Sequence, residues 1–586
     1  MNKFKIYILG IGLASMGLTS CTAAFLDVTS KTESTTDNFY RTENDAYRAL
    51  IGCYDGWQCT SSNVGCGFYY ASEIMADECF AGVGITDARN YQVLDRFDIN
   101  QSPSDMNILE DAWKNYYVAI YRCNELLTHE EQIKWNSEET KGTYLGECHA
   151  IRALCYFDMV RLWGSIPLFT EPVNENRPQA NPDEVYNVIF SDLLYAVNNI
   201  PANAYPKSAA ATNDGHITKY AAASLLARVY LYYTGYYGKE PLVEGVTKAT
   251  VLQGLEDFIA VAETESYGLV EEFKNLWPAA STSWEQNKST GDYEQTTTFA
   301  GDGNKEIVLA QKFNYTQDYN GNNDGNRWLV MMGLRSYLGH APYGRGWGGC
   351  TVNPAMWTAY GTGDARREAS IINIAGEGIF DDPNYETSYK DQREYTGYNV
   401  KKYTTMSKWN KDETSGNWSL VDEVFGLGEG DFQISQYQNF IVMRYSDVLL
   451  MAAELGSPNA QEYLNAVRKR AYTSKDDDGN LTISNFYREV SATKANIMKE
   501  RMLEFAFEGQ RYWDLLRQGV DYAASQIATN TAVQSGGNPD NVIISANNII
   551  EKKGLSQIPY NQITLSNGVL IPVSYTHLTL PTICSV

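Results

Sequence analysis

Paired helical patterns recur along this chain and constrain its fold more than any other feature of the sequence. Between positions 109 and 127, residues such as Trp113, Ile120 and Leu127 recur at intervals of three and four, which places them on one face of a helix. A second pattern runs from about Thr143 to Trp163 and ends at a glycine. Patterns of the same kind occupy 182–200, 218–232, 444–455, 458–471, 494–508 and 511–517, and Thr42 or Asn44 can cap an earlier one.

Small residues fall where neighbouring helices must approach closely, as at Ala153, Ala222 and Ala452. Paired helices with small contact residues, at a period of roughly 34 residues, are typical of tetratricopeptide-like stacking. No clean consensus repeats along the chain. The sequence therefore predicts a mostly α protein built on a tetratricopeptide-like helical repeat scaffold.

The character of the sequence changes between residues 236 and 440. This stretch is rich in Gly, Asn, Asp, Thr, Tyr and Trp, with short strand-like runs such as Glu306–Ala310 and loop-like runs such as Asn320–Asn326. Binding residues tend to lie on loops that a rigid scaffold positions. We therefore expect 236–440 to be a large loop-rich insert that binds a ligand.

The N-terminus has the pattern of an export signal. Lys3 and Lys5 precede an apolar run from Ile6 to Leu18, which is shorter than the roughly 20 residues that span a bilayer. Cys21 follows Leu-Thr-Ser, as in a bacterial lipoprotein, so residues 1–20 are predicted to be a lipoprotein signal peptide and Cys21 the lipidated residue. The alternative is an ordinary signal peptide with a chance cysteine.

Charge and aromatic content narrow the partners. The formal net charge of -24 argues against nucleic acid, because phosphates require basic patches. The chain has 42 Tyr and 12 Trp, and their amphipathic rings can cover a sugar face, although such rings also serve cores and interfaces. Composition thus favours a binding protein without settling the ligand.

Cysteine and histidine give no sign of a metal centre or of a hydrolase. Four cysteines near the start could pair in an exported chain, and no Cys-x-x-Cys spacing occurs among them. They are Cys53, Cys59, Cys66 and Cys79. Cys123, Cys148 and Cys155 lie in helical patterns and are interpreted as core residues. The five histidines form no His-Glu-x-x-His, and no Gly-x-Ser-x-Gly elbow appears. We expect no catalytic residues, no metal and no cofactor.

Five sequence blocks, taken in order, resemble one known family. They are Phe25-Leu26-Asp27 with Asn38-Phe39-Tyr40 and 49–54; 113–117 with Arg122-Cys123-Asn124; 146–168; 443–450 with Glu454, Leu464-Asn465 and 468–471; and 500–515. The chain resembles the SusD/RagB family of outer-membrane nutrient-binding lipoproteins, over Cys21 to about Leu570. The resemblance implies a helical scaffold with an inserted ligand region and no catalysis.

The resemblance also implies a place and partners. Family members capture oligosaccharide at the cell surface and cover a SusC-type TonB-dependent transporter, so we expect a lipid-anchored protein on the exterior face of the outer membrane. Thr22-Ala23-Ala24 replaces the acidic or polar export signal common in the family. The implied division is 1–20 signal peptide, 21–235 N-terminal helical region, 236–440 insert and 441–570 C-terminal helical region. Residues 571–586 are interpreted as a non-native, foreign or frame-shifted tail.

Ligand residues are expected from two variable regions. The family's sugar site draws polar residues from the first, which here carries Asp77, Arg89, Tyr91 and Arg96. The insert combines rings with planar hydrogen-bonding groups, namely Trp284, Asn326, Arg327, Trp328, Tyr343, Arg345 and Trp347. Glycines in the segment 343–349 are expected to leave its rings exposed and its loop mobile. The alternative is that these rings are local packing.

Acidic residues near the C-terminus could be mistaken for a catalytic pair. Glu500, Glu504, Glu508, Arg511 and Asp514 are instead expected to form internal ion pairs. Two other functions remain open: a binder of peptides or another nutrient within the same family, or a surface glycoside hydrolase, which would need two positioned carboxylates.

Overall fold

The computed structural model describes residues 39–62, 65–210, 215–286, 293–315, 325–411, 414, 418–427, 430–476 and 478–572. The lipidation residue Cys21, its signal peptide and most of the predicted non-native tail, 573–586, lie outside the described residues. Within the described part, no helix is both long and apolar enough to cross a bilayer.

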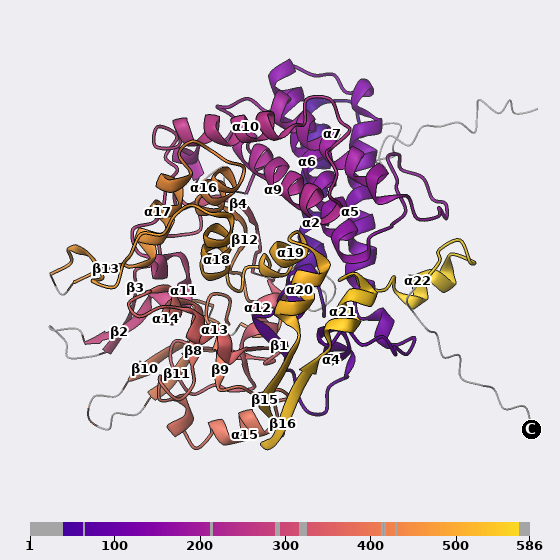
Figure 1. Cartoon of the computed structure of the whole chain (residues 1–586). Helices are drawn as coiled ribbons and strands as arrows, with labels where there is room; N and C mark the ends of the chain where they lie inside the picture. Colours follow the sequence, from indigo (N-terminus) through magenta and orange to yellow (C-terminus); the bar gives the residue numbers. More distant parts are fainter. Residues whose placement is uncertain are drawn as a thin grey trace, which may run out of the picture.

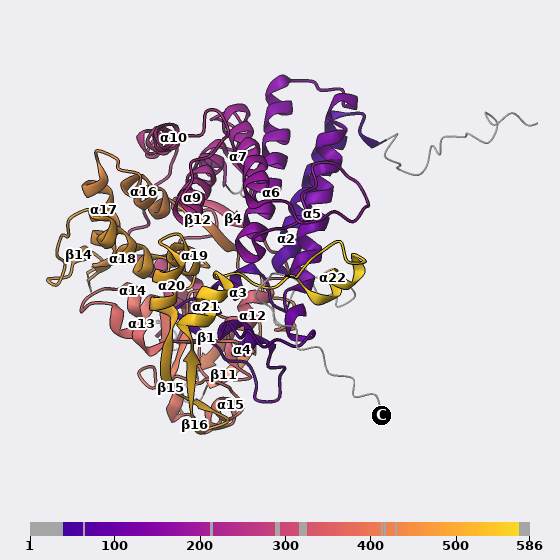
Figure 2. The same cartoon turned by 45° about the vertical axis from the view of Figure 1, so that its right-hand side comes forward.

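The N-terminal helices pack side by side and form the predicted scaffold (Figures 1 and 2). They are α2 (Glu43–Ser62), α5 (Glu110–Thr128), α6 (Glu138–Trp163), α7 (Pro182–Asn199) and α9 (Lys219–Tyr237). Helix α6 begins five residues before the predicted start. The Ser137 hydroxyl accepts hydrogen bonds from the amides of Glu139 and Thr140 at 3.1 and 3.3 Å, and this cap supports a polar first turn that the apolar pattern did not reveal.

Small residues let these helices approach closely. A Cβ placed on Gly56 of α2 would lie 2.9 Å from the Ala119 Cα of α5, so only glycine fits there. On α6, a Cβ at Gly146 would lie 2.5 Å from the side chain of Ile200, just after α7. Helices α2 and α5 therefore pack backbone against backbone at Gly56, and Gly146 makes room for the Ile200 side chain, the kind of close approach expected in tetratricopeptide-like stacking.

A second helical group closes the scaffold. It consists of α16 (Tyr445–Glu454), α17 (Ala460–Ala471), α18 (Lys494–Glu504) and α19 (Arg511–Leu516), and α10 (Lys248–Val261) packs between α9 and α16. Helix α18 ends four residues before the predicted end, because Phe507 and Gly509 adopt left-handed backbone angles, φ 64° and 69°. The strand-like run near residue 306 is strand β4 (Ile307–Gln311), which pairs antiparallel with β12 (Phe440–Arg444) beneath the helices.

The segment between these groups forms a lower layer of short elements (Figure 1). The sheet of this layer takes its first strand from the N-terminal region and has the order β1 (Cys79–Ala81), β7 (Cys350–Val352), β9 (Tyr398–Val400) and β8 (Ile371–Asn373). The remaining helices are α3 (Phe68–Ile74), α4 (Asn90–Asp95), α11 (Pro278–Ser281), α12 (Arg327–Met332), α13 (Pro354–Ala359), α14 (Arg366–Ser370), α15 (Tyr385–Lys390), α20 (Val520–Ile527), α21 (Ala546–Lys552) and α22 (Tyr560–Leu565). The remaining strands are β2 (Thr282–Gln286), β3 (Tyr293–Thr297), β5 (Leu334–Arg335), β6 (Arg345–Gly346), β10 (Lys408–Lys411), β11 (Trp418–Asp422), β13 (Thr473–Lys475), β14 (Leu481–Ile483), β15 (Thr529–Ser535) and β16 (Asn538–Ile544).

One continuous hydrophobic core joins the scaffold to this lower layer, and a smaller cluster of buried residues lies within the layer itself. The C-terminal hairpin β15–β16 reaches down to the insert, where Gln534 and Tyr395 exchange backbone hydrogen bonds of 2.9 and 2.7 Å. The protein is mostly helical, with a tetratricopeptide-like scaffold that presents an irregular layer of loops and short strands.

The cysteines near the N-terminus, which could pair in an exported chain, do not pair in the part of the chain that the structure covers. No disulfide joins Cys53, Cys59, Cys66 and Cys79 there. Cys53 lies beside Cys148 of α6 instead of beside another cysteine of its own group, because α2 packs along α5 and α6. The core assignment of Cys123, Cys148 and Cys155 is confirmed, since all three are buried.

Candidate functional site

Three of the predicted contact residues meet on one part of the molecule: Tyr91, Arg327 and Trp347. The guanidinium carbon of Arg327 lies 5.2 Å from the centre of the Trp347 ring, within the range of a cation–π contact. The charge of Arg327 also acts on the phenol of Tyr91. All three side chains are half-buried. We call this group the Tyr91–Arg327–Trp347 surface.

Backbone hydrogen bonds hold Trp347 against α12. The Trp347 amide donates to the Val330 carbonyl at 2.7 Å, and the Gly349 amide donates to the Met331 carbonyl at 2.6 Å. The start of α12 is fixed by Asn326, whose side-chain oxygen accepts from the Trp328 amide at 3.1 Å. Arg327 and Trp347 therefore sit on a framework of main-chain contacts.

Tyr91 reaches the same framework through Tyr70. The two rings meet edge to face, with centroids 5.7 Å apart, and the Tyr70 hydroxyl donates to the Gly349 carbonyl at 2.6 Å. Burial raises the pKa of Tyr91 to about 12, with further increases from Cys66 and Asp87, while Arg327 acts in the opposite direction. The Tyr91 phenol is therefore protonated at neutral pH and can donate a hydrogen bond.

Arg335, which the sequence patterns did not single out, ties this surface together. Its Nε donates to Asp391 at 2.8 Å, while Nη1 lies 3.3 Å from Asp87 and 3.4 Å from the carbonyl oxygen of Trp347. Asp87 also accepts from the Gly84 amide at 2.6 Å. Arg335 thus links the loop before α4 to the loop that carries Trp347. It stands in no recognisable motif, so only its partners mark its role.

Of the other three predicted residues in the N-terminal region, two form ion pairs and one is exposed. Asp77 forms a two-point ion pair with Arg511, at 2.8 and 2.7 Å. Arg96 pairs with the buried carboxylate of Glu394 at 2.5 Å. Arg89 is exposed where α4 begins. A ligand contact by these three residues together with Tyr91 stays a prediction.

Several insert residues also belong to the interior, which corrects their assignment as ligand contacts. Trp328 and Tyr343 are only 4 % and 3 % exposed, so their faces are covered. Asn326 is buried and caps α12. Arg345 is not interior: its side chain is 38 % exposed and pairs with Glu423 at 2.8 Å, so its ligand contact stays a prediction. Trp284 lies in β2, and its side chain is outside the described residues.

The glycines of segment 343–349 serve close packing rather than mobility. A Cβ on Gly346 would lie 2.5 Å from the Gly333 Cα, because β6 runs parallel to β5 at that point. Gly344 donates its amide to the Thr405 carbonyl at 2.8 Å. The segment is fixed on both sides by these contacts, and of its two rings Tyr343 is buried whereas Trp347 is half-buried.

The C-terminal acidic residues form the predicted internal ion pairs. Glu508 pairs with Arg444 and Lys402, and Glu504 pairs with Arg444, Arg470 and Arg366, all with carboxylates at most 3 % exposed. Burial opposes ionisation of Glu504, but its arginine partners outweigh burial and hold its pKa well below the ordinary value. These carboxylates neutralise buried arginines and have no access to a ligand.

A cleft that includes none of the predicted residues lies between α2 and β4. It has a volume of about 470 Å³, and its walls include Tyr54, Trp57 and His216. Behind this wall, the buried carboxylate of Glu147 accepts hydrogen bonds from Tyr54, from Tyr205 at 2.7 Å, and lies 2.7 Å from Nδ1 of His216. These contacts fix the rings that line the cleft.

Two family models match the two ends of the chain. A family model described as "SusD family" matches residues 428–571, and another described as "Starch-binding associating with outer membrane" matches residues 25–231. "SusD-like protein P38" of Formosa agariphila is 24% identical over 545 residues, covering 88% of this chain and 92% of that protein. A "SusD-like protein" of Bacteroides ovatus is 31% identical over 134 residues, which cover 22% of this chain and 23% of that protein.

Solved structures share the fold. Surface glycan-binding protein A from Bacteroides thetaiotaomicron, determined in complex with laminarihexaose, superposes with a TM-score of 0.67 at 22% identity, covering 91% of this chain and 99% of that chain. A laminarin-binding SusD-like protein superposes with a TM-score of 0.65 at 24% identity, covering 91% of this chain and 100% of that chain. The fold of these two proteins therefore extends over nearly the whole of this chain.

Proposed function

The chain belongs to the SusD family, and from this premise we propose that it binds an oligosaccharide at the Tyr91–Arg327–Trp347 surface. The observation that carries the proposal is the half-buried Trp347 ring with Arg327 5.2 Å from its centre, next to the protonated phenol of Tyr91. An indole face covers the C–H surface of a sugar ring, while a guanidinium and a phenol bond its hydroxyls.

The residues of the Tyr91–Arg327–Trp347 surface are held in place before a ligand binds. Trp347 is held by main-chain hydrogen bonds to α12, and Arg335 fastens the adjoining loop. A preorganised site loses little side-chain freedom on binding, so more of the contact energy contributes to affinity. One structural relative was solved with laminarihexaose and another is a laminarin-binding protein, which supports testing laminarin oligosaccharides first.

The polar groups beside this surface support binding without bond cleavage. Asp87 and Asp391 both accept hydrogen bonds from Arg335, which fixes them as parts of the loop framework. A glycoside hydrolase needs one carboxyl group to protonate the leaving oxygen and a second carboxylate across the sugar. Each of these two aspartates uses Oδ2 to hold Arg335, and on this ground we propose a non-enzymatic protein.

We further propose that Cys21 is lipidated and anchors the protein on the exterior face of the outer membrane. There it would capture substrate and deliver it to a SusC-type TonB-dependent transporter. The "associating with outer membrane" description of the matched N-terminal model supports this placement. In this proposal the helical regions 21–235 and 441–570 form the body of the protein, and the insert 236–440 supplies most of the ligand contacts.

Binding to a glycan panel tests the proposal. Calorimetry would measure the affinity of the purified chain for laminarihexaose, maltoheptaose and a peptide mixture, and a reducing-sugar assay would run in parallel. We expect Trp347→Ala to weaken oligosaccharide binding at least tenfold. Trp357→Ala is the matched control, because Trp357 is also half-buried and has Arg367 at 4.8 Å from its ring centre, yet it belongs to α13.

Three other outcomes would each contradict a part of the proposal. Equal weakening by the two tryptophan variants, with both folded, would contradict the assigned surface. Binding of peptides but of no glycan would replace the ligand class. Release of reducing sugar by the purified chain would overturn the non-enzymatic assignment.

A further inference from the structure

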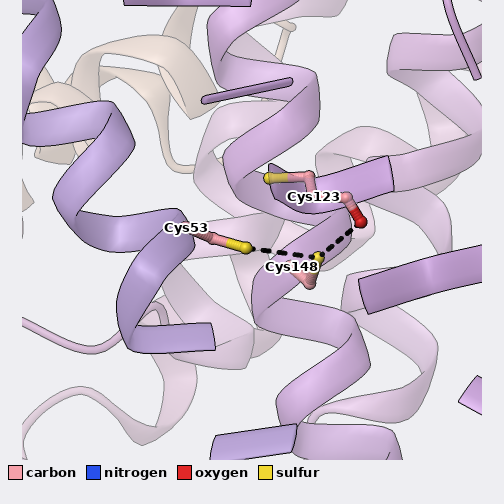
Figure 3. Close-up of side chains that lie close together, drawn as sticks. All are labelled: Cys53, Cys123 and Cys148. Atoms are coloured by element: carbon pink, nitrogen blue, oxygen red, sulfur yellow. Dashed lines mark hydrogen bonds between the residues drawn. The ribbon is translucent and has the colours of Figure 1, made fainter. Parts of the chain in front are cut away.

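Three buried thiols meet between helices of the N-terminal scaffold. None of them takes part in the Tyr91–Arg327–Trp347 surface. Cys53 of α2, Cys123 of α5 and Cys148 of α6 have sulfur atoms that all lie within 4.8 Å of one another (Figure 3). The Cys53 and Cys148 sulfurs are 4.0 Å apart, and the Cys148 sulfur lies 3.5 Å from the Cys123 carbonyl oxygen. Each thiol comes from a different helix, and each is 0 % exposed.

The packing of α2, α5 and α6 brings these thiols to the same level along the three helices. Gly56 lies nearly one turn after Cys53, and Ala119 lies one turn before Cys123. These two small residues are the point where α2 and α5 touch backbone to backbone. Arg122 fastens the same pair, because its Nη1 donates to the Gly52 carbonyl at 2.8 Å. The sulfur cluster is therefore held by rigid neighbours and is not produced by mobile side chains.

The spacing of the sulfurs matches that of ligands around a shared ion. A point equidistant from three sulfurs that are 4.0 to 4.8 Å apart lies roughly 2.3–2.8 Å from each, and about 2.3 Å is the ordinary zinc–thiolate distance. A disulfide needs sulfurs at about 2.05 Å, so Cys53 and Cys148 would have to move much closer to form one. The observed triangle fits a coordinated ion better than a covalent pair.

A buried ion pair lies beside the cluster. Arg152 follows Cys148 by one turn of α6 and is fixed by Asp192 at 2.8 Å and by Asn124 at 2.8 Å. This pair adds to the rigid polar surroundings of the three sulfurs.

We propose that Cys53, Cys123 and Cys148 form a trigonal site for a thiophilic monovalent d10 cation, with Cu⁺ as the ion tested. Soft thiolates select such ions. Among the described residues, no fourth His, Cys, Asp or Glu joins the group, whereas structural Zn²⁺ normally takes four ligands. Binding leaves the oxidation state of copper unchanged, and each thiol that becomes a thiolate releases one proton to water.

Burial also predicts how the ion enters. The sulfurs are closed off by α2, α5 and α6, so an ion reaches them only when these helices separate locally or before they assemble. Loading of the folded protein is therefore expected to be slow and to speed up in mild denaturant, whereas refolding with Cu⁺ present loads the site at once. A surface site would load at the same rate under both conditions.

The test uses the full chain carrying Cys21→Ser, reduced and kept free of oxygen. Cu⁺ is titrated against a coloured Cu⁺ chelator, and X-ray absorption measures the copper–sulfur shell. We expect one Cu⁺ per chain, bound by three sulfurs at about 2.3 Å. Cys123→Ser is expected to weaken binding about 100-fold or more. Cys155→Ser, which alters another buried thiol of α6, is the matched control and keeps full affinity.

Three results would overturn the proposal. The first is Cu⁺ binding that is equal in the parent, Cys123→Ser and Cys155→Ser proteins, each verified as folded by circular dichroism. The second is tighter binding of Zn²⁺ than of Cu⁺, which would reject the trigonal geometry. The third is a Cys53–Cys148 disulfide in protein isolated from its own cell envelope, detected by mass spectrometry without reduction. The X-ray absorption measurement needs no variant, so it remains decisive if a variant fails to fold.

Discussion

Arg444 and Glu508 face each other as a two-point ion pair in the core. Nε of Arg444 donates to one carboxylate oxygen of Glu508 at 2.9 Å, and Nη2 donates to the other at 2.8 Å. The same guanidinium also contacts Glu504 and Glu306, at 2.7 and 2.6 Å. One buried arginine thus joins β12, the end of α18 and the start of β4.

Removing this arginine should destabilise the protein strongly. Arg444→Leu would leave buried carboxylates without their principal partner, and breaking a buried pair in this way costs about 3–5 kcal/mol. Urea unfolding of the purified chain measures the free energy of unfolding. Lys390→Ala, which breaks the exposed pair with Glu386, is the control and should change nothing measurable. A loss below about 1 kcal/mol for Arg444→Leu would show that the network reorganises without it.

Glu73 should make stability fall as pH rises. Burial raises the pKa of this carboxyl to about 8 in the folded protein, although the Gly509 amide and Lys402 act against the rise. The unfolded chain titrates near 4.5, so between about pH 4.5 and 8 the folded state holds a proton that the unfolded state has lost. Stability from this group is full below pH 4.5 and declines up to pH 8.

The variant Glu73→Gln tests that relation. It keeps an oxygen that can accept from the Gly509 amide and cannot ionise, so the difference in unfolding free energy between pH 5 and pH 8 should shrink relative to the parent protein. Glu263→Gln, at an exposed position, should leave that difference unchanged. An identical pH dependence in the parent and Glu73→Gln proteins would mean that Glu73 is ionised in the core.

Arg335 should affect ligand binding without touching the sugar. Arg335→Met removes the links to Asp391 and to the Trp347 carbonyl, and on the proposed function it should weaken oligosaccharide binding about tenfold through loss of preorganisation. Faster hydrogen exchange of the Gly348 amide would report the loosened loop. Arg367→Met, beside the control residue Trp357, should change neither quantity. Weaker binding with unchanged exchange would instead make Arg335 a direct contact.

Two glycines should respond to alanine in opposite directions. In Gly346→Ala the new Cβ would meet the Gly333 backbone at 2.5 Å, so the β5–β6 pair must move, and we expect a loss of about 1–3 kcal/mol. Gly52 lies within α2 with no atom within 4 Å of its added Cβ, so Gly52→Ala should gain roughly 0.5–1 kcal/mol from helix propensity. Thermal and urea unfolding check both signs. A stabilising Gly346→Ala would remove the packing role of that glycine.

The helices could be predicted from the sequence because each has an apolar face of regular period and a chemical signal at its end. The patterns around Trp113 and Leu193 are confirmed in α5 and α7, and Asn181 caps α7 by accepting from the Asp183 amide. A helix boundary could not be predicted where a polar turn extends the helix beyond its apolar pattern, as at the start of α6. Fold class follows from such periodic patterns, which each helix carries within its own residues.

The site was harder to predict, because the sequence around an aromatic residue does not show whether its ring will be exposed or buried. Trp328 and Trp347 look alike in the sequence, yet Trp328 packs against Tyr403 and Phe440 while Trp347 remains half-buried. The difference depends on β12 and on residues near 403, more than 50 positions away along the chain. Arg335 was missed for the same reason, since its partner Asp87 lies 248 residues before it.

The main-chain bonds that join residues 347–349 to α12 do not involve the side chain at position 347. Any residue other than proline can make the same main-chain bonds at this position. Phenylalanine, tyrosine or histidine would therefore offer a different ring from the same backbone path. If Trp347 contacts the ligand as proposed, a single substitution at position 347 changes ligand preference while the main-chain framework is kept.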